Sequence, residues 1–205
     1  MDAPSDEKLL REFLAGQKGS FELLVRRHAP ELYRFVYRMT GSSAAAEDIV
    51  QETLLKVWLG GREFNPARRF RPWVFTIAAN KARDHIRKRD RHKELPFEAV
   101  IDEKEESGKR YLDLLVSAEP KSTEEVGVEE RRKIVRSVLA ELPKQLSEVL
   151  VLAYYHHFSY KEIGEVAGIA VGTVKSRLHT ALVRFGERYR EAVESRTEPV
   201  EEEEE

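Results

Sequence analysis

The polar residues best suited to contact a nucleic acid lie between residues 172 and 185. They carry positive charges, hydroxyls or an imidazole, and they are Thr173, Lys175, Ser176, Arg177, His179 and Thr180. Side chains of these types bind phosphate oxygens and the edges of bases in a major groove. Apolar residues recur on the other side of the same helical pattern, at Val174, Leu178, Leu182 and Phe185. The spacing therefore predicts a helix with a buried stripe and a basic outer face.

A second helix and a tight turn must come before this basic helix. Ser159 followed by Glu162 is a capping box, which predicts a helix start, and Gly168 is placed to end that helix in a left-handed conformation. Two short helices joined by a tight turn are typical of a helix-turn-helix, whose second helix enters a major groove. An ordinary helical hairpin with a solvated basic face gives the same pattern, so this segment alone does not distinguish a helix-turn-helix from such a hairpin.

Residues 70 to 91 form a second basic segment. An apolar stripe predicts the buried side of a helix, at Val74, Ile77, Ala78, Ala82 and Ile86. Polar residues lie away from this stripe, at Asn80, Arg83, Asp84, Arg87, Lys88 and Arg91. Aromatic residues gather near the start of the segment, at Phe64, Phe70, Trp73 and Phe75. Rings beside a basic surface suit unpaired bases, and an asparagine can read a base edge. Aromatic residues at helical spacing also pack into cores, so the sequence leaves both base stacking and core packing possible for Trp73 and Phe75.

An acidic face is predicted on the helix over residues 44 to 59. Its outer patch combines polar residues with one leucine, at Asp48, Gln51, Glu52 and Leu55. The buried stripe is predicted at Ile49, Val50, Thr53, Leu54, Val57 and Trp58. A solvated face is the simpler interpretation, but a polar patch with an apolar edge is also how a protein docking surface looks.

Composition narrows the class of protein. The net charge is only −2, yet residues 62 to 93 hold 11 Lys and Arg against 3 Asp and Glu, while residues 94 to 130 hold 4 against 12. Segregated charge of this kind is compatible with a nucleic-acid surface beside solvated linkers.

There is no cysteine and no long apolar run, and the N-terminus is acidic, so we expect a cytoplasmic protein that does not insert into a membrane. The six histidines are scattered and no phosphate-binding glycine loop is present. We therefore expect no catalytic residue, no metal site and no cofactor.

Helical periodicity dominates the chain and predicts an all-α fold with two small helical domains, over residues 5–91 and 129–190. Residues 92–128 read as a flexible acidic linker, with one short helix near 111–116. Residues 191–205 read as an acidic, disordered tail. Pro30 is expected to kink or split the helix over residues 20–39.

Taken together, these segments resemble one family. The order is DIVQET (48–53), FRPWVFTIAANKARDHIR (70–87), an acidic linker, LPKQLSEVL (142–150) and GTVKSRL (172–178). It is similar to bacterial RNA polymerase sigma factors of the sigma-70 family, in the compact extracytoplasmic-function (ECF) group, which keeps only regions 2 and 4. The resemblance covers about residues 8–91 and 129–189.

The resemblance implies a function for each surface. The helix with Asp48, Gln51, Glu52 and Leu55 would dock on the β′ coiled coil of the polymerase core, and region 4 would contact the β flap. The segment from residue 70 to 91 would recognise and open the −10 promoter element, through Phe70, Trp73, Asn80, Arg83, Asp84, Arg87 and Lys88. Asn80 matches a position beside the pocket for a flipped base. The helix at 172–185 would read the −35 element, and an anti-sigma factor is an expected partner.

This chain departs from the family pattern in its recognition helix, which continues with Thr180, Ala181 and Leu182 where relatives often carry further basic residues. Three other interpretations stay open at this point: a regulator that binds operator DNA alone, an enzyme, and a helical interaction module without a DNA role.

Overall fold

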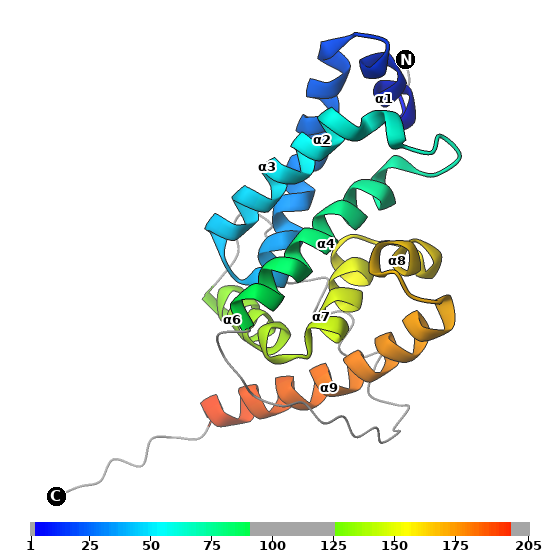
Figure 1. Cartoon of the computed structure of the whole chain (residues 1–205). Helices are drawn as coiled ribbons and strands as arrows, with labels where there is room; N and C mark the ends of the chain where they lie inside the picture. Colours follow the sequence, from blue (N-terminus) through cyan, green and yellow to red (C-terminus); the bar gives the residue numbers. More distant parts are fainter. Residues whose placement is uncertain (1–2, 91–125, 198–205) are drawn as a thin grey trace, which may run out of the picture. The chain divides into compact units, whose positions relative to one another are not determined.

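The computed structural model describes residues 3–90 and 126–197, and the regular elements within these ranges are all helical (Figure 1). This confirms the predicted all-α class. The described residues form two compact units, one over residues 3–90 and 158–171, the other over residues 126–157 and 172–197. The short helix predicted near 111–116, residues 92–125 of the predicted linker and residues 198–205 of the predicted tail lie outside the described residues. The predicted domain boundaries stay predictions.

In the first unit, α2 (Lys18–Thr40) is the central helix and packs against α1 (Asp6–Leu14), α3 (Ser43–Gly60) and α4 (Phe70–Asp90). Pro30 lies inside α2 without interrupting it, so the expected split is wrong. Leu24 and His28 are buried before the proline, and Leu32 and Phe35 are buried after it. Packing on both sides of Pro30 therefore offsets the roughly 3 kcal/mol that a proline costs inside a helix.

The two helices that carry the predicted docking and basic faces are α3 (Ser43–Gly60) and α4 (Phe70–Asp90), with the short helix η1 (Gly61–Glu63) after α3. Ser42 caps α3, because its side chain accepts the N–H of Ala45 at 3.3 Å. The predicted apolar stripe of α4 is buried throughout, at Val74, Ile77, Ala78, Ala82 and Ile86. Burial of this stripe turns the polar side of α4 outward.

In the second unit, α6 (Val126–Glu141) is followed by Pro143 and by α7 (Lys144–Leu150). After Leu150 the chain continues directly into η2 (Val151–Tyr155), which has π-helical hydrogen bonding. Apolar side chains of both helices are buried, with Val135 and Val138 from α6 and Val149 and Leu150 from α7.

The predicted helix-turn-helix elements are present as α8 (Tyr160–Ala167) and α9 (Val171–Thr197). Ser159 and Glu162 form the capping box in both directions, and Gly168 ends α8 with φ 69°, in the left-handed region that favours glycine. The α9 stripe is buried at Val174, Leu178 and Phe185, whereas Leu182 is half-buried. α9 continues past residue 190, where the predicted domain ends, to Thr197.

None of the helices within residues 3–90 and 126–197 is both long enough and apolar enough to cross a membrane.

Candidate nucleic-acid interface

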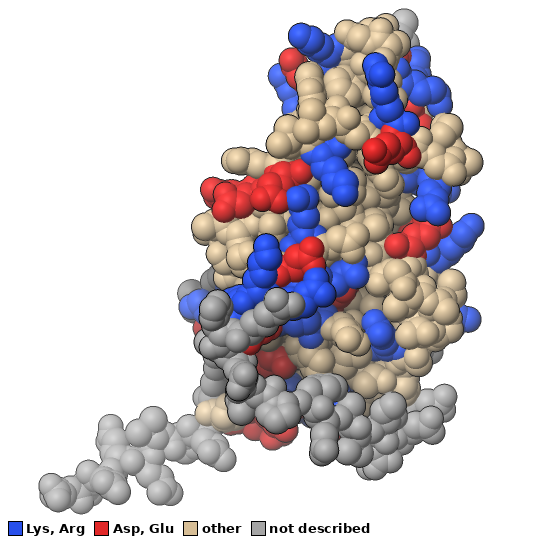
Figure 2. Space-filling view, viewed as in Figure 1, with Lys and Arg blue, Asp and Glu red and all other residues tan. Residues whose placement is uncertain are grey.

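The outer face of α4 presents the polar residues that the sequence singled out. Asn80, Asp84 and Arg87 are exposed at successive helical turns, and Lys88 is exposed beside them. Figure 2 shows Lys and Arg side chains around the C-terminal part of α4, with acidic atoms among them. Asp84 forms an ion pair with Arg87, so this carboxylate orients an arginine within the face. The face can contact phosphate oxygens through its cations and a base edge through Asn80.

The aromatic residues at the start of α4 divide into core and surface. Phe70 and Phe75 are buried, and the Phe75 ring centroid lies 5.3 Å from that of Phe35. Phe70 packs against Phe64 and Trp73, so its side chain lies in the core and offers no open ring for a base. The ring centroid of Trp73 lies 4.9 Å from that of Phe64. Trp73 is only half-buried, so part of the indole remains accessible.

The loop before α4 adds two cations that the sequence analysis did not assign to the site. Asn65 begins the loop, where its side chain accepts the N–H of Ala67 at 2.9 Å and its carbonyl accepts the N–H of Arg68 at 2.9 Å. Both Arg68 and Arg69 are exposed. The signal that could have found them is their position in the basic block, directly before the aromatic start of the helix.

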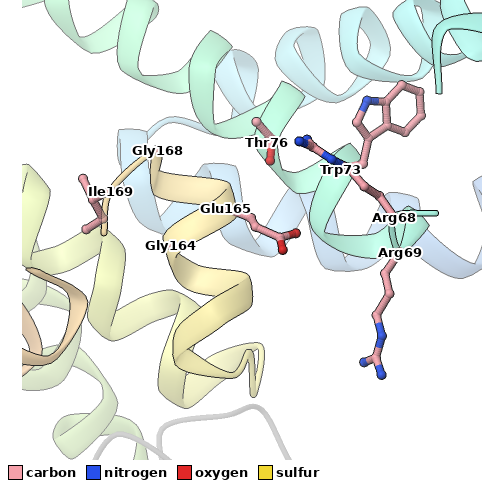
Figure 3. Close-up of a pocket in the computed structure, with 8 residues that line it drawn as sticks. All are labelled: Arg68, Arg69, Trp73, Thr76, Gly164, Glu165, Gly168 and Ile169. Carbon is pink, nitrogen blue, oxygen red and sulfur yellow. The ribbon is translucent and has the colours of Figure 1, made fainter. Parts of the chain in front are cut away.

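A cavity of about 400 Å³ opens between this loop and α8. Arg68, Arg69, Trp73 and Thr76 line one side, and Gly164, Glu165, Gly168 and Ile169 line the other. In Figure 3, the Arg68 and Trp73 side chains lie together near the start of α4, and Glu165 faces them from α8. An aromatic ring beside a guanidinium suits a planar, electron-rich group such as a nucleobase.

α8 binds some of the candidate DNA-binding groups of α4 and of the loop before it. The guanidinium of Arg83 donates to the carbonyl of Val166 at 3.0 Å, and Arg69 pairs with Glu162 at 3.2 Å. Burial opposes ionisation of Glu162, but hydrogen bonds from Ser159 and the charge of Arg69 outweigh it and lower the pKa of this carboxyl. The ring of Phe158 also packs edge-on against Phe75 at 4.9 Å. Arg83 is therefore engaged within the protein and half-buried, unlike the exposed Arg87.

The predicted outer patch of α3 is exposed as a set, at Asp48, Gln51, Glu52 and Leu55. The structure adds Leu59, whose exposure of 73% is above the 56% of Leu55. Both leucines line a shallow depression of about 520 Å³ together with Glu52 and Lys81. Such exposed leucines among charged groups are typical of a protein docking site.

Two details of this patch were not expected. Trp58 is 41% exposed rather than buried, because its ring packs at the surface against Phe13 and Phe21, with centroids 4.8 and 5.0 Å away. Lys81 of α4 donates a hydrogen bond to Glu52, and this bond with its positive charge lowers the pKa of Glu52. The ion pair joins the α3 patch to the basic helix.

The recognition-helix candidates all lie on the accessible side of α9. Lys175, Ser176 and His179 are exposed, whereas Arg177 is half-buried, as are Thr173 and Thr180. The hydroxyl of Ser176 donates to the carbonyl of Thr173, and that of Thr180 donates to the carbonyl of Ser176, each at 3.1 Å. These two hydroxyls keep their oxygens as acceptors, so the strongest donors on this face are Lys175 and Arg177.

A metal centre finds no support in residues 3–90 and 126–197, where no three His, Asp or Glu side chains come together in a way that could hold an ion.

Two family models match this chain, one in each half of the sequence. The Sigma-70 region 2 model matches residues 24–92, and the Sigma-70, region 4 model matches residues 132–185. The chain is 34% identical over 169 residues to ECF RNA polymerase sigma factor SigL of Mycobacterium tuberculosis, which covers 82% of this chain and 88% of that protein. It is 31% identical over 173 residues to ECF RNA polymerase sigma factor SigW of Bacillus subtilis, covering 84% and 90% of the two chains.

Two solved structures are similar to this chain in fold. The sigma factor RpoE in complex with the anti-sigma factor NepR from Bartonella quintana is similar with a TM-score of 0.62 and 25% identity, over 83% of this chain and 96% of that one. The fold also matches CnrH in complex with the cytosolic domain of CnrY, with a TM-score of 0.65 and 23% identity, over 95% and 100% of the two chains. Two family matches in the order region 2 then region 4, with relatives aligned along most of their length, show that this chain belongs to the ECF group of the sigma-70 family.

Proposed function

We propose that this protein is the promoter-specificity subunit that joins the RNA polymerase core and directs transcription initiation at promoters with −10 and −35 elements. One observation carries the proposal beyond family membership. A docking patch on α3 and a basic, partly aromatic face on α4 lie on adjacent helices of one unit, joined by the ion pair between Glu52 and Lys81. This arrangement lets one unit hold the polymerase and contact the DNA strand that the polymerase is to open.

In this proposal the α3 patch binds the β′ coiled coil of the core. Leu55 and Leu59 supply the apolar contact, and Asp48, Gln51 and Glu52 supply polar and charged contacts around it. An apolar centre with a polar rim is the usual composition of a protein interface.

The α4 face and the preceding loop read the −10 element. Arg68, Arg87 and Lys88 bind the backbone, and Trp73 and Asn80 receive unstacked bases. Opening of the duplex is then driven by capture of bases that have left the stack, and the subunit itself catalyses no reaction. Asn80 is the residue for base choice, because its amide carries both a donor and an acceptor.

The outer face of α9 reads the −35 element in the major groove, with Lys175, Ser176, Arg177 and His179 as the main contacts and Thr173 and Thr180 beside them. The same unit would also contact the β flap of the polymerase. Because both DNA-binding parts belong to one chain, binding of the first makes binding of the second intramolecular.

We further propose that the protein works in the cytoplasm under the control of an anti-sigma factor. The Bartonella quintana neighbour was solved with such a partner, NepR. A regulator that covered the exposed leucines of α3 would block the polymerase without touching the DNA-binding helices.

The test is transcription reconstituted with purified core polymerase on a library of promoters randomised at the −10 and −35 positions. The wild-type protein should select one sequence class at each position. Asp48→Arg combined with Glu52→Arg should abolish core binding and transcription while circular dichroism shows the same helix content. Glu22→Arg is the matched control, because Glu22 is exposed but lies on α2, outside the α3 patch. Wild-type protein that leaves the start-site choice of the core unchanged would overturn the proposal.

A further inference from the structure

The N-terminal helix α1 lies before the segment that the region 2 model matches, which starts at residue 24. Nevertheless, α1 packs on three elements of the first unit: α2, η1 and α4. Its residues Leu9 and Leu10 are almost completely buried. A Cβ added at Gly61 would lie 3.4 Å from both Leu10 and Leu14, so α1 sits directly on the backbone that leads into the loop before α4.

One residue of α1 reaches the first residue of α4. The Oε1 atom of Glu7 accepts the backbone N–H of Phe70 at 2.9 Å, across a separation of 63 positions in the sequence. The first N–H groups of a helix have no partner inside the helix, and they favour a negative charge. Arg69, the residue before α4, has only donors in its side chain and cannot cap the helix itself. Glu7 therefore acts as an N-cap supplied by another helix.

The position of Glu7 is fixed by its neighbours. Asp6 binds two residues of α2, forming an ion pair with Arg27 and a hydrogen bond of 2.9 Å with Nε2 of His28. Arg27 also donates to the carbonyl of Pro4 at 3.1 Å, and Ser5 accepts the N–H of Lys8 at 3.3 Å. The first turn of α1 is thus anchored to α2 on one side while it caps α4 on the other.

The capped residue is the point from which the candidate −10 surface extends. The Phe70 ring lies 5.8 Å from that of Trp73 and 5.2 Å from that of His28, so its backbone position sets where the indole lies. Arg68 and Arg69 are the two residues immediately before it. A shift of the Phe70 backbone therefore moves the cations and the aromatic group of this surface together.

We propose that Glu7 is a positioning residue for −10 recognition, which orders the loop over residues 65–69 and the first turn of α4 without touching DNA. This inference rests on the proposed function of α4. The bond to Phe70 should matter for reading and opening the promoter and should not matter for binding the polymerase, because the α3 patch is formed by other residues.

The experiment compares Glu7→Ala, Glu7→Gln and Glu12→Ala in the full-length protein. Glu12 is the matched control, since it accepts a hydrogen bond of 2.8 Å from Ser20 of α2 and makes no bond to α4 in the described structure. Three quantities are measured for each variant: the Kd for core polymerase, the rate of open-complex formation on a promoter that the wild type recognises, and amide hydrogen exchange at residues 70–73.

Glu7→Ala should slow open-complex formation about 2-fold to 30-fold, the range that corresponds to the loss of a helix cap. It should speed exchange at residues 70–73 and leave the Kd for core within about twofold. Glu7→Gln keeps an acceptor oxygen and should restore most of the rate, while Glu12→Ala should behave like wild type.

Two results would overturn the inference: Glu7→Ala and Glu12→Ala giving the same rates and exchange, or Glu7→Gln being as impaired as Glu7→Ala. A wild-type protein indifferent to the −10 sequence is a different result, because it would refute the proposed function of α4 and not the capping role, which the exchange measurement tests separately.

Discussion

Two exposed leucines on α3 give a quantitative test of the docking patch. Leu55 and Leu59 are 56% and 73% exposed, and full burial of a leucine stabilises an interface by about 1.5–3 kcal/mol. Taking about 2 kcal/mol for full burial of a leucine and multiplying it by these exposed fractions gives about 1.1 kcal/mol for Leu55 and about 1.5 kcal/mol for Leu59. Alanine keeps the Cβ contact, so the double variant Leu55→Ala with Leu59→Ala should weaken binding by about 2 kcal/mol, which is about 30-fold in Kd.

The assay is equilibrium binding of fluorescently labelled protein to core polymerase, followed by anisotropy. Leu23→Ala is the matched control, because Leu23 is 47% exposed but lies on α2. It should leave the Kd within about twofold of wild type. Thermal unfolding of all three proteins checks that the fold is kept. A double variant that binds core as tightly as the Leu23→Ala control would show that these leucines do not contact the polymerase.

Three further outcomes are expected. Asn80→Ala should change the base preference at one −10 position more than it changes total promoter affinity, as measured by selection from a randomised promoter library. Lys175→Ala with Arg177→Ala should weaken −35-dependent transcription, and the slope of log K against log salt should become shallower by about one unit for each phosphate that the variant no longer neutralises. Asp6→Asn should lower the thermal midpoint at pH 7, since burial raises the pKa of Asp6 but the hydrogen bonds and charges of His28 and Arg27 together outweigh it and lower that pKa. A lowered carboxyl pKa contributes stability above the ordinary value of that pKa, and this stability is lost as pH falls through the folded-state pKa, so the two midpoints should converge in acid.

The predictions that the structure confirms depend on short sequence spacings. The capping box of Ser159 with Glu162, the left-handed end at Gly168 and the buried stripe of α4 involve residues at most a few turns apart. Local patterns of this kind are set by the helical period and by the chemistry of one or two side chains.

What the sequence could not predict depends on packing between distant segments. Pro30 indicated a break, but burial on both sides of it keeps α2 continuous. Phe70 is of a residue type suited to base stacking, and only the packing of Phe64 and Trp73 around it shows that its ring is in the core. The Glu7 contact with Phe70 joins two helices with no shared periodicity, so no pattern in the chain could indicate it.

The ion pair between Glu52 and Lys81 has a thermodynamic consequence. One partner belongs to the surface proposed for the polymerase, and the other belongs to the helix proposed for DNA. A polymerase cation that takes Glu52 as its partner leaves the Lys81 ammonium available to a phosphate. By linkage, a phosphate that takes Lys81 favours the polymerase to the same degree. Because the Glu52 side chain is 62% exposed, solvent limits this coupling to at most about 1 kcal/mol. A coupling of this size favours the state in which polymerase and promoter are both bound, and it leaves each binding step reversible.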